Sequence, residues 1–562
     1  MNDLNQLFEH DELREQIAYL TKELVKIPSV SHTNGEKVIA DRIKQWISQF
    51  PYFKQHPDHL WEQEIPGDPY GRKNIFAWIQ ANPTAKKTVI YHSHIDTVNV
   101  KDFGNLENIA FDSEQLGEFF KNYDHDETIK IEAQSGDWMF GRGVLDMKSG
   151  AAIHIANLHY FSENLDKLHG NVLAMFNPDE ETQHIGIISA ISELTRLQKE
   201  NDLEYICAIN NDFTSPLFEG DSSKYIYTGF AGKLLPSFFI YGREVHVGET
   251  LKGIDSTLVA SEINKQINNN MALAEQIEGE VILPPSCLQQ RDRKESYTVQ
   301  TPFKTGIYFN YFLYKDTPSD VLRKLKQQAK VACDEVEQYL QMNYKQYLQR
   351  LGQVDQSISF KIEVVTIEEL IQELRGKNIP VERTIRNVAE RTKGEELRDR
   401  AFKIVEALQE LDEQKKPRVI LFFSPPYCPN HSIQYDREGN EQLIKELEQL
   451  INDVQNKTKE EIKMKEFFPF LADSSYIACQ ESKSELDVLM ANFIGWDETY
   501  SLPIQEIQAL NIPSINIGVY GKDGHKWTER VYKPYSFELV PHMIRTLTEK
   551  LLLSSDRSLF IR

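Results

Sequence analysis

The stretch Gly141-Arg142-Gly143-Val144-Leu145-Asp146-Met147-Lys148-Ser149-Gly150 joins a glycine turn to the start of a helix. The glycines permit backbone angles that a side chain would forbid, so a tight turn is expected here. Asp146 follows this turn, and a helix of small residues is expected to begin near Lys148. A carboxylate held at such a junction can bridge two metal ions, but a Gly-rich turn before a helix is more often plain connection. The stretch alone therefore leaves the function open.

Strands and helices alternate on both sides of this stretch. Short runs rich in β-branched and aromatic residues predict strands over Asn74–Ile79, Thr88–His92, Asn171–Phe176 and Leu203–Ile209. Apolar residues at helical spacing predict helices over residues 11–27, after Gly35, after Asp146 and after Gly186. Residues 101–140 are expected to form an acidic loop with an irregular strand or two. The alternation indicates an α/β fold, with a sheet covered by helices.

The pattern changes after Tyr227-Thr228-Gly229. A strand-helix-strand-strand-helix-strand order, ending at residue 366, predicts a separate small α+β domain. The next segment is highly charged and helical in pattern, and a solvated helical insertion or lid is expected there. Arg418–Ser424 then restarts the α/β pattern. The predicted organisation is a first domain over 1–227, an α+β domain over 228–366, a charged helical insertion over 367–416, and the second part of the first domain over 417–562.

Composition excludes several classes of protein. The chain of 562 residues is 40% hydrophobic and 26% charged, an ordinary globular balance. Its formal net charge of -22 argues against a nucleic-acid or anionic-membrane partner. No run approaches the length of a membrane span, and Met1-Asn2-Asp3-Leu4 is unlike a secretion signal. The five cysteines show no paired spacing, as expected for thiols in a reducing compartment. A cytoplasmic location is therefore expected.

Side chains of the metal-binding type follow strands or turns of the interrupted domain. They are His94, Asp146, Glu181, Asp212 and His525. Each motif alone is more often a solvated loop or a satisfied histidine. Together, two histidines and three carboxylates are what a pair of divalent ions needs when one carboxylate bridges them. Mixed imidazole and oxygen ligands favour Zn²⁺, with Mn²⁺ or Co²⁺ as alternatives.

Two neighbours of these residues suit supporting roles. His94 and Asp96 lie two residues apart after a predicted strand, so both can face one site, where Asp96 orients or tunes the histidine. Adjacent side chains in Asp179-Glu180-Glu181 point in different directions. One glutamate can therefore bind metal while its neighbour, Glu180, handles a proton.

The ordered set of motifs resembles the M20 family of metallopeptidases and amidohydrolases, which holds aminoacylases, deacetylases, dipeptidases and glutamate carboxypeptidases. The matching pieces are His94-Ile95-Asp96, Gly141–Gly150, Asp179-Glu180-Glu181, Asp212, His246 and His525. The length, the insertion and the stretch Phe467–Tyr476 further resemble the arginine-utilisation branch of that family. The resemblance implies a catalytic domain with a mixed sheet covered by helices, interrupted by a ferredoxin-like α+β lid or dimerisation domain.

The resemblance also assigns a role to each matching residue. Asp146 would bridge both ions, His94 and Asp212 would complete one site, and Glu181 and His525 the other. Glu180 would be the general base and acid, and Asp96 would orient His94. His246 would come from the small domain and stabilise an oxyanion. In many relatives that histidine is supplied by the other subunit of a dimer, so a homodimer is an open alternative to a monomer.

Two departures from the family pattern bear on the substrate. The chain has Asn211-Asp212-Phe213 where many relatives have Glu-Pro, and an Asp there resembles the aminopeptidase and dipeptidase members. Asp202 is a weaker candidate for the same role. The chain reads Asn310-Tyr311-Phe312 where relatives often carry Asp-x-Arg.

The expected function is metal-dependent hydrolysis of a peptide or N-acyl amide bond of a small amino-acid-derived substrate. Arginine or amino-acid catabolism is the expected setting. The alternatives are a dipeptidase or aminopeptidase of the same family, and a non-catalytic metal-binding regulatory relative.

Overall fold

The computed structural model of the protein describes residues 12–280, 282–353, 358–433 and 440–553. The chain divides into two units. Unit 1 contains Met1–Phe230, His431–Cys479 and Pro503–Arg562, and unit 2 contains Ala231–Asn430 and Gln480–Leu502. The first unit is thus interrupted and resumed, and the stretch Met1-Asn2-Asp3-Leu4 lies outside the described residues.

Unit 1 is built on a mixed sheet of eight strands in the order β1-β2-β5-β3-β6-β16-β7-β15. These strands are β1 (Leu60–Glu64), β2 (Lys73–Gln80), β3 (Lys87–His94), β5 (Asn171–Asn177), β6 (Glu204–Asn210), β7 (Lys224–Tyr227), β15 (Ile462–Lys465) and β16 (Ser514–Ile517). The central strands β5, β3, β6 and β16 are parallel to one another. Parallel strands align their carboxyl ends, so the residues that follow β3, β5 and β6 gather at one edge of the sheet.

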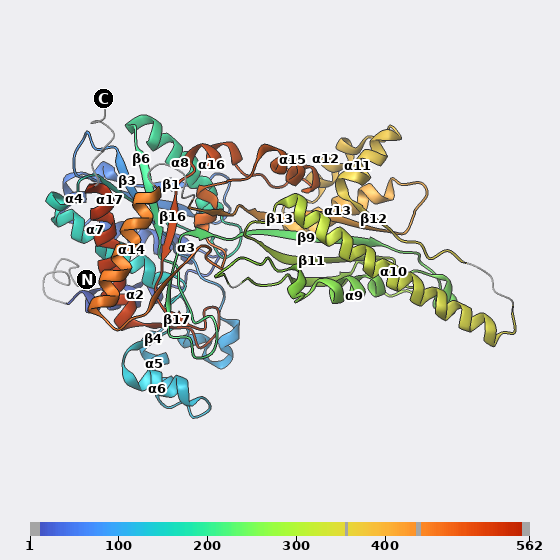
Figure 1. Cartoon of the computed structure of the whole chain (residues 1–562), viewed down its shortest axis with the longest axis horizontal. Helices are drawn as coiled ribbons and strands as arrows, with labels where there is room; N and C mark the ends of the chain where they lie inside the picture. Colours follow the sequence, from blue (N-terminus) through green and yellow to red (C-terminus); the bar gives the residue numbers. More distant parts are fainter. Residues whose placement is uncertain (1–11, 281, 354–357, 434–439, 554–562) are drawn as a thin grey trace. The chain divides into compact units, whose positions relative to one another are not determined.

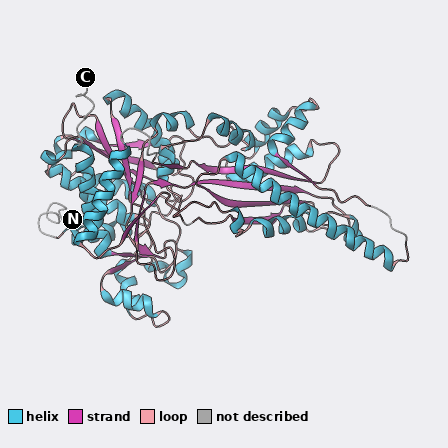
Figure 2. Cartoon of the chain, in the orientation of Figure 1, coloured by secondary structure: helices cyan, strands magenta, loops and turns pink. Residues whose placement is uncertain are grey.

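Helices cover this sheet (Figure 2). The α-helices of unit 1 are α2 (Leu13–Val25), α3 (Gly35–Ile47), α4 (Pro51–Gln55), α5 (Ser113–Lys121), α6 (Glu127–Ser135), α7 (Lys148–Glu163), α8 (Ile185–Asn201), α14 (Asn440–Lys457), α16 (Ile504–Leu510) and α17 (Val540–Leu553). α7 and α17 contact β3, and α8 contacts β2. α7 is buried over almost its whole length, which explains its run of small and apolar residues. The predicted α/β class, a mixed sheet covered by helices, is confirmed.

Short elements complete unit 1. They are the short helical turns η1 (Pro57–His59), η2 (Lys101–Ile109), η3 (Leu165–Lys167), η6 (Asp473–Ile477) and η7 (Pro534–Leu539), and the strands β4 (Trp138–Phe140), β8 (Gly229–Phe230), β14 (His431–Ser432), β17 (Gly521–Lys522) and β18 (Arg530–Tyr532). Residues 101–140 are more helical than predicted. The side chain of Asp112 caps α5 and that of Asp126 caps α6 by accepting backbone N–H groups. The acidic residues read as loop signals are therefore helix caps.

Unit 2 contains a five-stranded sheet in the order β10-β11-β9-β13-β12. Its strands are β9 (Gly232–Tyr241), β10 (Ser286–Asp292), β11 (Lys304–Leu313), β12 (Glu363–Thr366) and β13 (Arg418–Cys428). Its helices are α9 (Ser256–Ile267), α10 (Pro318–Arg350), α11 (Ile367–Gly376), α12 (Val381–Arg391), α13 (Leu397–Glu410) and α15 (Lys483–Asn492), with the turns η4 (Val247–Lys252) and η5 (Met271–Leu273). The predicted strand-helix-strand-strand-helix-strand order is observed, but β10 lies before Thr298–Tyr314, the segment in which one long strand or two are expected, and only β11 lies within that segment.

The second unit extends further along the chain than predicted. β13 was assigned to the resumed first domain, but it pairs with β9 and β12 in the second sheet. The segment 367–416 belongs to the same unit: α11–α13 lie on one face of the sheet and α9 and α10 on the other (Figure 1). Val388, Ile404 and Leu408 pack there with Phe239 and Phe422. β13 is buried at every position because both sheet faces are covered, so its sequence resembles that of a strand in a doubly covered α/β sheet.

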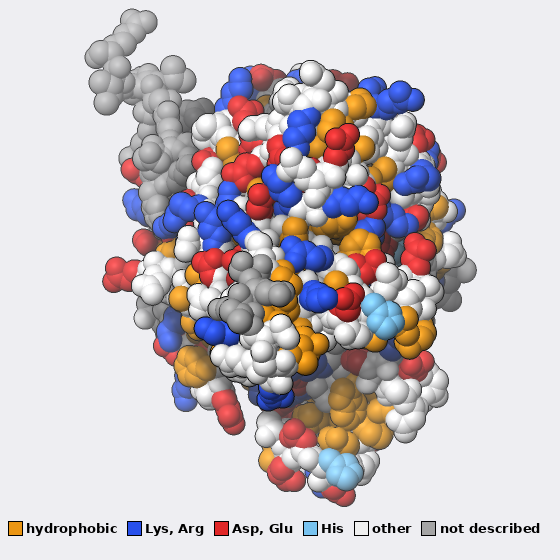
Figure 3. Space-filling model, turned by 90° about the vertical axis from the view of Figure 1, so that its right-hand side faces the viewer, with side chains coloured by type: hydrophobic (Ala, Val, Ile, Leu, Met, Phe, Trp, Pro, Cys, Tyr) orange, Lys and Arg blue, Asp and Glu red, His pale blue; other side chains and the backbone are white. Residues whose placement is uncertain are grey.

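The surface shows no strong segregation of charge in the view of Figure 3. Lys and Arg side chains there are interspersed with Asp and Glu. Within the part of the chain that the structure describes, no helix is both long and apolar enough to cross a membrane.

Candidate metal centre

The carboxyl end of β3 delivers the first two functional side chains. His94 is the last residue of β3, and both His94 and Asp96 are buried. Oδ1 of Asp96 accepts the backbone N–H of Glu180 at 3.0 Å, and Oδ2 accepts that of Glu181 at 3.2 Å. Nδ1 of His94 lies 3.5 Å from Oδ1 of Asp96, which is long for a hydrogen bond. Asp96 therefore faces His94 as predicted, and it also holds the backbone of the two glutamates.

The glycine turn places Asp146 between two histidines. Gly143 has φ 79°, and a Cβ there would come within 2.7 Å of the Thr97 side chain, so the turn requires glycine. Nε2 of His94 lies 2.9 Å from Oδ1 of Asp146, and Nε2 of His525 lies 2.9 Å from Oδ2. Each oxygen of the carboxylate thus faces a different imidazole. This is the arrangement that a bridging ligand of two cations needs.

A buried ion pair fixes this turn from the other end of the chain. Arg142 and Glu529 are each 1% exposed, and the Arg142 guanidinium donates to Oε2 of Glu529 at 2.6 Å. Oε1 of Glu529 accepts the backbone N–H groups of Leu145 at 3.1 Å and Asp146 at 3.3 Å. Burial raises the pKa of Glu529 to about 7, although the charge of Arg142 opposes this shift. The pair sets the backbone from which the Asp146 side chain projects.

The acidic triplet follows β5 and is equally constrained. Asp179 has φ 70° and is fully buried, and it accepts a 2.5 Å hydrogen bond from the Arg72 guanidinium. Oε1 of Glu181 lies 3.1 Å from Nε2 of His525. Oε2 of Glu180 lies 4.0 Å from Nε2 of His94. As predicted, the two glutamates point to different partners: Glu181 contacts His525, and Glu180 lies beside the His94–Asp146 pair.

Asp212 lies at the carboxyl end of β6 and is 3% exposed. Its Oδ1 accepts the backbone N–H of Phe213 at 2.7 Å. Burial raises the pKa of Asp212 well above its usual range, and the charge of Asp146 adds to this shift. Asp202, the weaker candidate for the same role, is exposed and pairs with Lys86. The structure thus places Asp212, and not Asp202, near Asp146.

The donor set fits divalent cations. Ligand atoms of His94, Asp146 and Glu181 all lie within 4.8 Å of one another. Burial raises the pKa of Glu181, and the charge of Asp146 adds to the rise. Burial lowers the pKa of His525, but the hydrogen bonds to Asp146 and Glu181 outweigh it and raise the value to about 12. The predicted ligands include three carboxylates, those of Asp146, Glu181 and Asp212, but only two imidazoles. Cations that bind between these groups would compensate the negative charge of the carboxylates.

His246, the remaining predicted residue, belongs to unit 2. It immediately precedes η4, and its Nδ1 accepts the backbone N–H of Gly248 at 3.0 Å. Its side chain is exposed. Because it lies in the other unit, its role toward the metal ligands stays a prediction.

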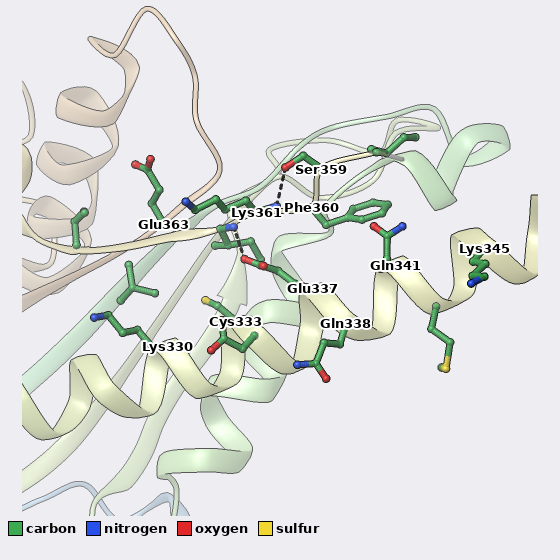
Figure 4. Close-up of a pocket in the computed structure, with 16 residues that line it drawn as sticks. Lys330, Cys333, Glu337, Gln338, Gln341, Lys345, Ser359, Phe360, Lys361 and Glu363 are labelled. Atoms are coloured by element: carbon green, nitrogen blue, oxygen red, sulfur yellow. Dashed lines mark hydrogen bonds between the residues drawn. The ribbon is translucent and has the colours of Figure 1, made fainter. Parts of the chain in front are cut away.

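Unit 2 also has a cavity of about 980 Å³ between α10 and residues 358–365 (Figure 4). Figure 4 shows Cys333 and Glu337 on the helix beside Phe360 and Lys361. Oε1 of Glu337 accepts the backbone N–H of Ile362 at 2.6 Å, so this carboxylate fixes the neighbouring segment. No histidine is among the described residues that line the cavity. The predicted metal ligands lie in unit 1, where imidazoles and carboxylates meet.

Several residues around this centre are not predicted from the sequence. Glu529 follows His525 by four positions, and nothing in the spacing indicates that it holds the Asp146 turn. His184 lies three residues after Glu181, and Asp473 lies in the stretch Phe467–Tyr476 that carried the resemblance to one branch of the M20 family. His184 and Asp473 form a buried pair beside Glu180.

Comparisons with known proteins identify the family. Residues 90–500 match the model of peptidase family M20/M25/M40. The chain belongs to this family. It is 49% identical over 540 residues to Protein RocB of Bacillus subtilis (strain 168), and the match covers 96% of this chain and 95% of that protein. It is 34% identical over 552 residues to protein YqjN of the same organism, over 97% of each chain.

The fold comparison agrees. A tripeptidase from Staphylococcus aureus superposes with a TM-score of 0.52 at 14% identity, covering 96% of this chain and 99% of that chain. At this identity the likeness shows the fold alone. The predicted membership of the M20 family is confirmed, and the match to Protein RocB supports the predicted branch. The chain is therefore an M20-type hydrolase of the metallopeptidase class.

Proposed function

We propose that this chain hydrolyses the amide bond of a small peptide or an N-acyl amino acid with the help of two divalent ions. One observation carries the proposal: the two oxygens of Asp146 each lie 2.9 Å from a different histidine, His94 or His525. The carboxylate of the neighbouring Glu180 lies 4.0 Å from Nε2 of His94, which is beyond hydrogen-bond distance. A carboxylate in that position suits proton transfer and not ligation.

The chain's residues divide into two ligand sets around Asp146. His94 and Asp212 are proposed to hold one ion and Glu181 and His525 the other, with Asp146 shared. Mixed imidazole and carboxylate donors favour Zn²⁺ over Mn²⁺ or Co²⁺. When bound, such ions lower the pKa of a water and polarise the substrate carbonyl.

Glu180 is proposed to move the proton. Its carboxylate takes the proton of the attacking water and returns it to the leaving amine. Asp96 holds the backbone from which this carboxylate projects, because it accepts the backbone N–H of Glu180 at 3.0 Å. Glu180 is only 7% exposed, and burial raises its pKa well above the usual range. His246 is proposed to donate a hydrogen bond to the oxyanion that forms on the substrate carbonyl.

The setting of the reaction is proposed from a relative and from the cysteines. The likeness to Protein RocB supports a role in amino-acid catabolism, and arginine utilisation is the branch proposed from the sequence. The five cysteines, all among the described residues, form no disulfide bond, which agrees with a reducing cytoplasm. A homodimer in which His246 acts on the partner's site stays a prediction.

A dipeptidase or aminopeptidase of the same family is the second candidate. The observation that favours it is Asp212, buried near Asp146 where many relatives have a glutamate. Free-amine dipeptides and N-acetylated amino acids distinguish the two candidates, because a dipeptidase requires the free amine. Faster turnover of the free-amine series would identify the dipeptidase.

The proposed mechanism is tested by Glu180→Gln. Turnover of the best substrate in the presence of Zn²⁺, Mn²⁺ or Co²⁺ should fall by about 10²–10⁴-fold, because the amide cannot accept a proton. Metal content should not change, since Glu180 is not a proposed ligand. Glu118→Gln, at an exposed position of α5, is the matched control and should leave turnover unchanged. Unchanged turnover of Glu180→Gln would contradict the proposed mechanism. A wild-type protein that binds two ions but hydrolyses none of the substrates would favour the non-catalytic alternative.

A further inference from the structure

A second buried cluster lies beside Glu180 and contains none of the proposed metal ligands. It consists of His92, His184 and Asp473, called here the His–Asp–His cluster. His92 comes from β3, His184 from the residue before α8, and Asp473 from the start of η6. All three are at most 2% exposed. The cluster joins three segments of unit 1 that are far apart in the sequence.

Asp473 is held between the two imidazoles. Nδ1 of His184 donates to Oδ1 of Asp473 at 2.9 Å. Oδ2 of Asp473 lies 3.6 Å from Nε2 of His92, and Nδ1 of His92 lies 2.9 Å from Oγ of Ser474. An imidazole whose Nδ1–H donates to a buried carboxylate is fixed in tautomer and orientation. The His184 ring therefore has a single orientation set by Asp473.

The fixed ring lies near the proposed base. Donor or acceptor atoms of Glu180, His184 and Asp473 all lie within 4.8 Å of one another. Glu180 is also 4.0 Å from His94, so its carboxylate lies close to two histidines with different roles. The Glu180 backbone is already held by Asp96. A group that restrains its side chain is what a base needs to meet the attacking water in one geometry.

We propose that His184 and Asp473 are positioning residues for Glu180: Asp473 orients the His184 ring, and this ring restrains the Glu180 carboxylate. The inference rests on the proposed function, because it takes Glu180 as the base. It extends that function to a segment of chain, around Asp473, that supplies none of the proposed ligands. His184 and Asp473 act through Glu180 and touch neither the substrate nor the ions.

Glu180, His184 and Asp473 also have the donor types of a metal site. The 2.9 Å separation of Nδ1 and Oδ1 is that of a hydrogen bond already formed between two of the donors. A third ion would have to break this bond and enter a cluster with almost no exposed surface. Positioning is therefore the inference that the geometry favours, and a third ion is an outcome that the experiment detects.

The test is a double-mutant cycle between Asp473→Asn and Glu180→Gln. Asp473→Asn keeps the shape of the side chain but removes the carboxylate that fixes the tautomer of His184. In the wild-type background, kcat should fall by about 10²-fold, with KM and the content of two ions unchanged. In the Glu180→Gln background, Asp473→Asn should cause no further loss, because the residue it positions no longer acts as a base.

Two further variants sharpen the cycle. His184→Gln retains an amide donor and should recover part of the kcat that His184→Leu loses. His431→Gln is the matched control: His431 is also buried in unit 1, hydrogen-bonded to Ser514 at 2.9 Å, and its substitution should leave kcat unchanged. If Asp473→Asn fails to fold, as judged by circular dichroism, His184→Gln takes its place in the cycle.

Each result decides for or against the inference. Equal losses in both backgrounds would show a purely structural role and overturn it, as would unchanged kcat in Asp473→Asn. Three ions per wild-type chain, with one lost in the His184 and Asp473 variants, would overturn it in favour of a metal site. Failure of the proposed function looks different: the wild-type protein itself would hydrolyse neither substrate series.

Discussion

Replacing Glu529 by Gln should destabilise unit 1 although no proposed ligand changes. The glutamine retains an oxygen that can accept the N–H groups of Leu145 and Asp146, which the Glu529 carboxylate accepts at 3.1 and 3.3 Å. Its amide nitrogen then takes the place of Oε2, which lies 2.6 Å from the Arg142 guanidinium. Two donors would face each other at a site where both partners are 1% exposed.

The size of the effect follows from this burial. Removing one partner of a buried ion pair costs about 3–5 kcal/mol, since the other charge is left uncompensated. Arg142 retains Asp102, whose Oδ1 it contacts at 2.8 Å, so the expected loss for Glu529→Gln is near the lower end, about 3 kcal/mol. A looser turn at Asp146 should also weaken metal binding by about 10–100-fold.

Urea unfolding followed by tryptophan fluorescence measures the loss. Five of the six tryptophans, all but Trp496, lie in unit 1, so the signal reports mainly on that unit. A cycle with Arg142→Met isolates the pair: the double variant should lose about 2 kcal/mol less than the sum of the single variants. Glu118→Gln, an exposed substitution, should stay within about 0.5 kcal/mol of wild type. A loss below about 1 kcal/mol for Glu529→Gln, or strict additivity, would refute the argument.

Two further predictions concern the metal centre and acid stability. Asp146→Asn should weaken the binding of both ions, because each oxygen of the Asp146 carboxylate faces a different histidine. His525→Ala should weaken mainly the binding of one ion. Two tightly held ions in Asp146→Asn, measured by metal analysis after dialysis, would contradict the bridging role. Burial lowers the pKa of His154 in the folded protein to about 3, whereas a histidine of the unfolded chain has a pKa of about 6.5. Above about pH 6.5 the imidazole is therefore neutral in both the folded and the unfolded chain, and below this pH only the unfolded chain binds the additional proton. Stability is therefore lost as pH falls: between pH 7.5 and 5.5 the wild type should lose about 1.4 kcal/mol more than His154→Phe, and equal losses in urea unfolding would disprove this origin.

Local sequence patterns predicted most elements of unit 1. The apolar spacing over residues 11–27 corresponds to α2, and the small-residue run after Asp146 is α7. Such signals work because helix periodicity and burial act within a few turns of chain. The loop predicted over residues 101–140 was wrong, because acidic residues such as Asp112 and Asp126 are common both in loops and at the starts of helices. Only the structure shows that their side chains accept backbone N–H groups of α5 and α6 and so cap these helices.

β13 shows a different limit of the sequence. An apolar run buried on both faces is typical of a strand in a doubly covered α/β sheet, and the run alone does not say which sheet. β13 pairs with β9 in the second sheet, and α11–α13 cover the face of this sheet that a two-layer α+β domain leaves open. This cover is why β13 is buried on both faces although it lies outside the first sheet. Strand partners depend on tertiary packing, so the predicted boundary at residue 417 was placed too early.

The sequence by itself determined the family and the order of the proposed ligand motifs, because both are carried by short stretches such as Gly141–Gly150 and Asp179-Glu180-Glu181. Only the tertiary structure decided what supports them. Glu529 reaches Arg142 across 387 positions of sequence, and Asp473 reaches His184 across 289. No local pattern encodes such contacts, since the partners are hundreds of residues apart in the sequence and meet only when unit 1 folds. The turn that carries Asp146 is thus read from ten residues, but the groups that hold it in place come from the far end of the same folded unit.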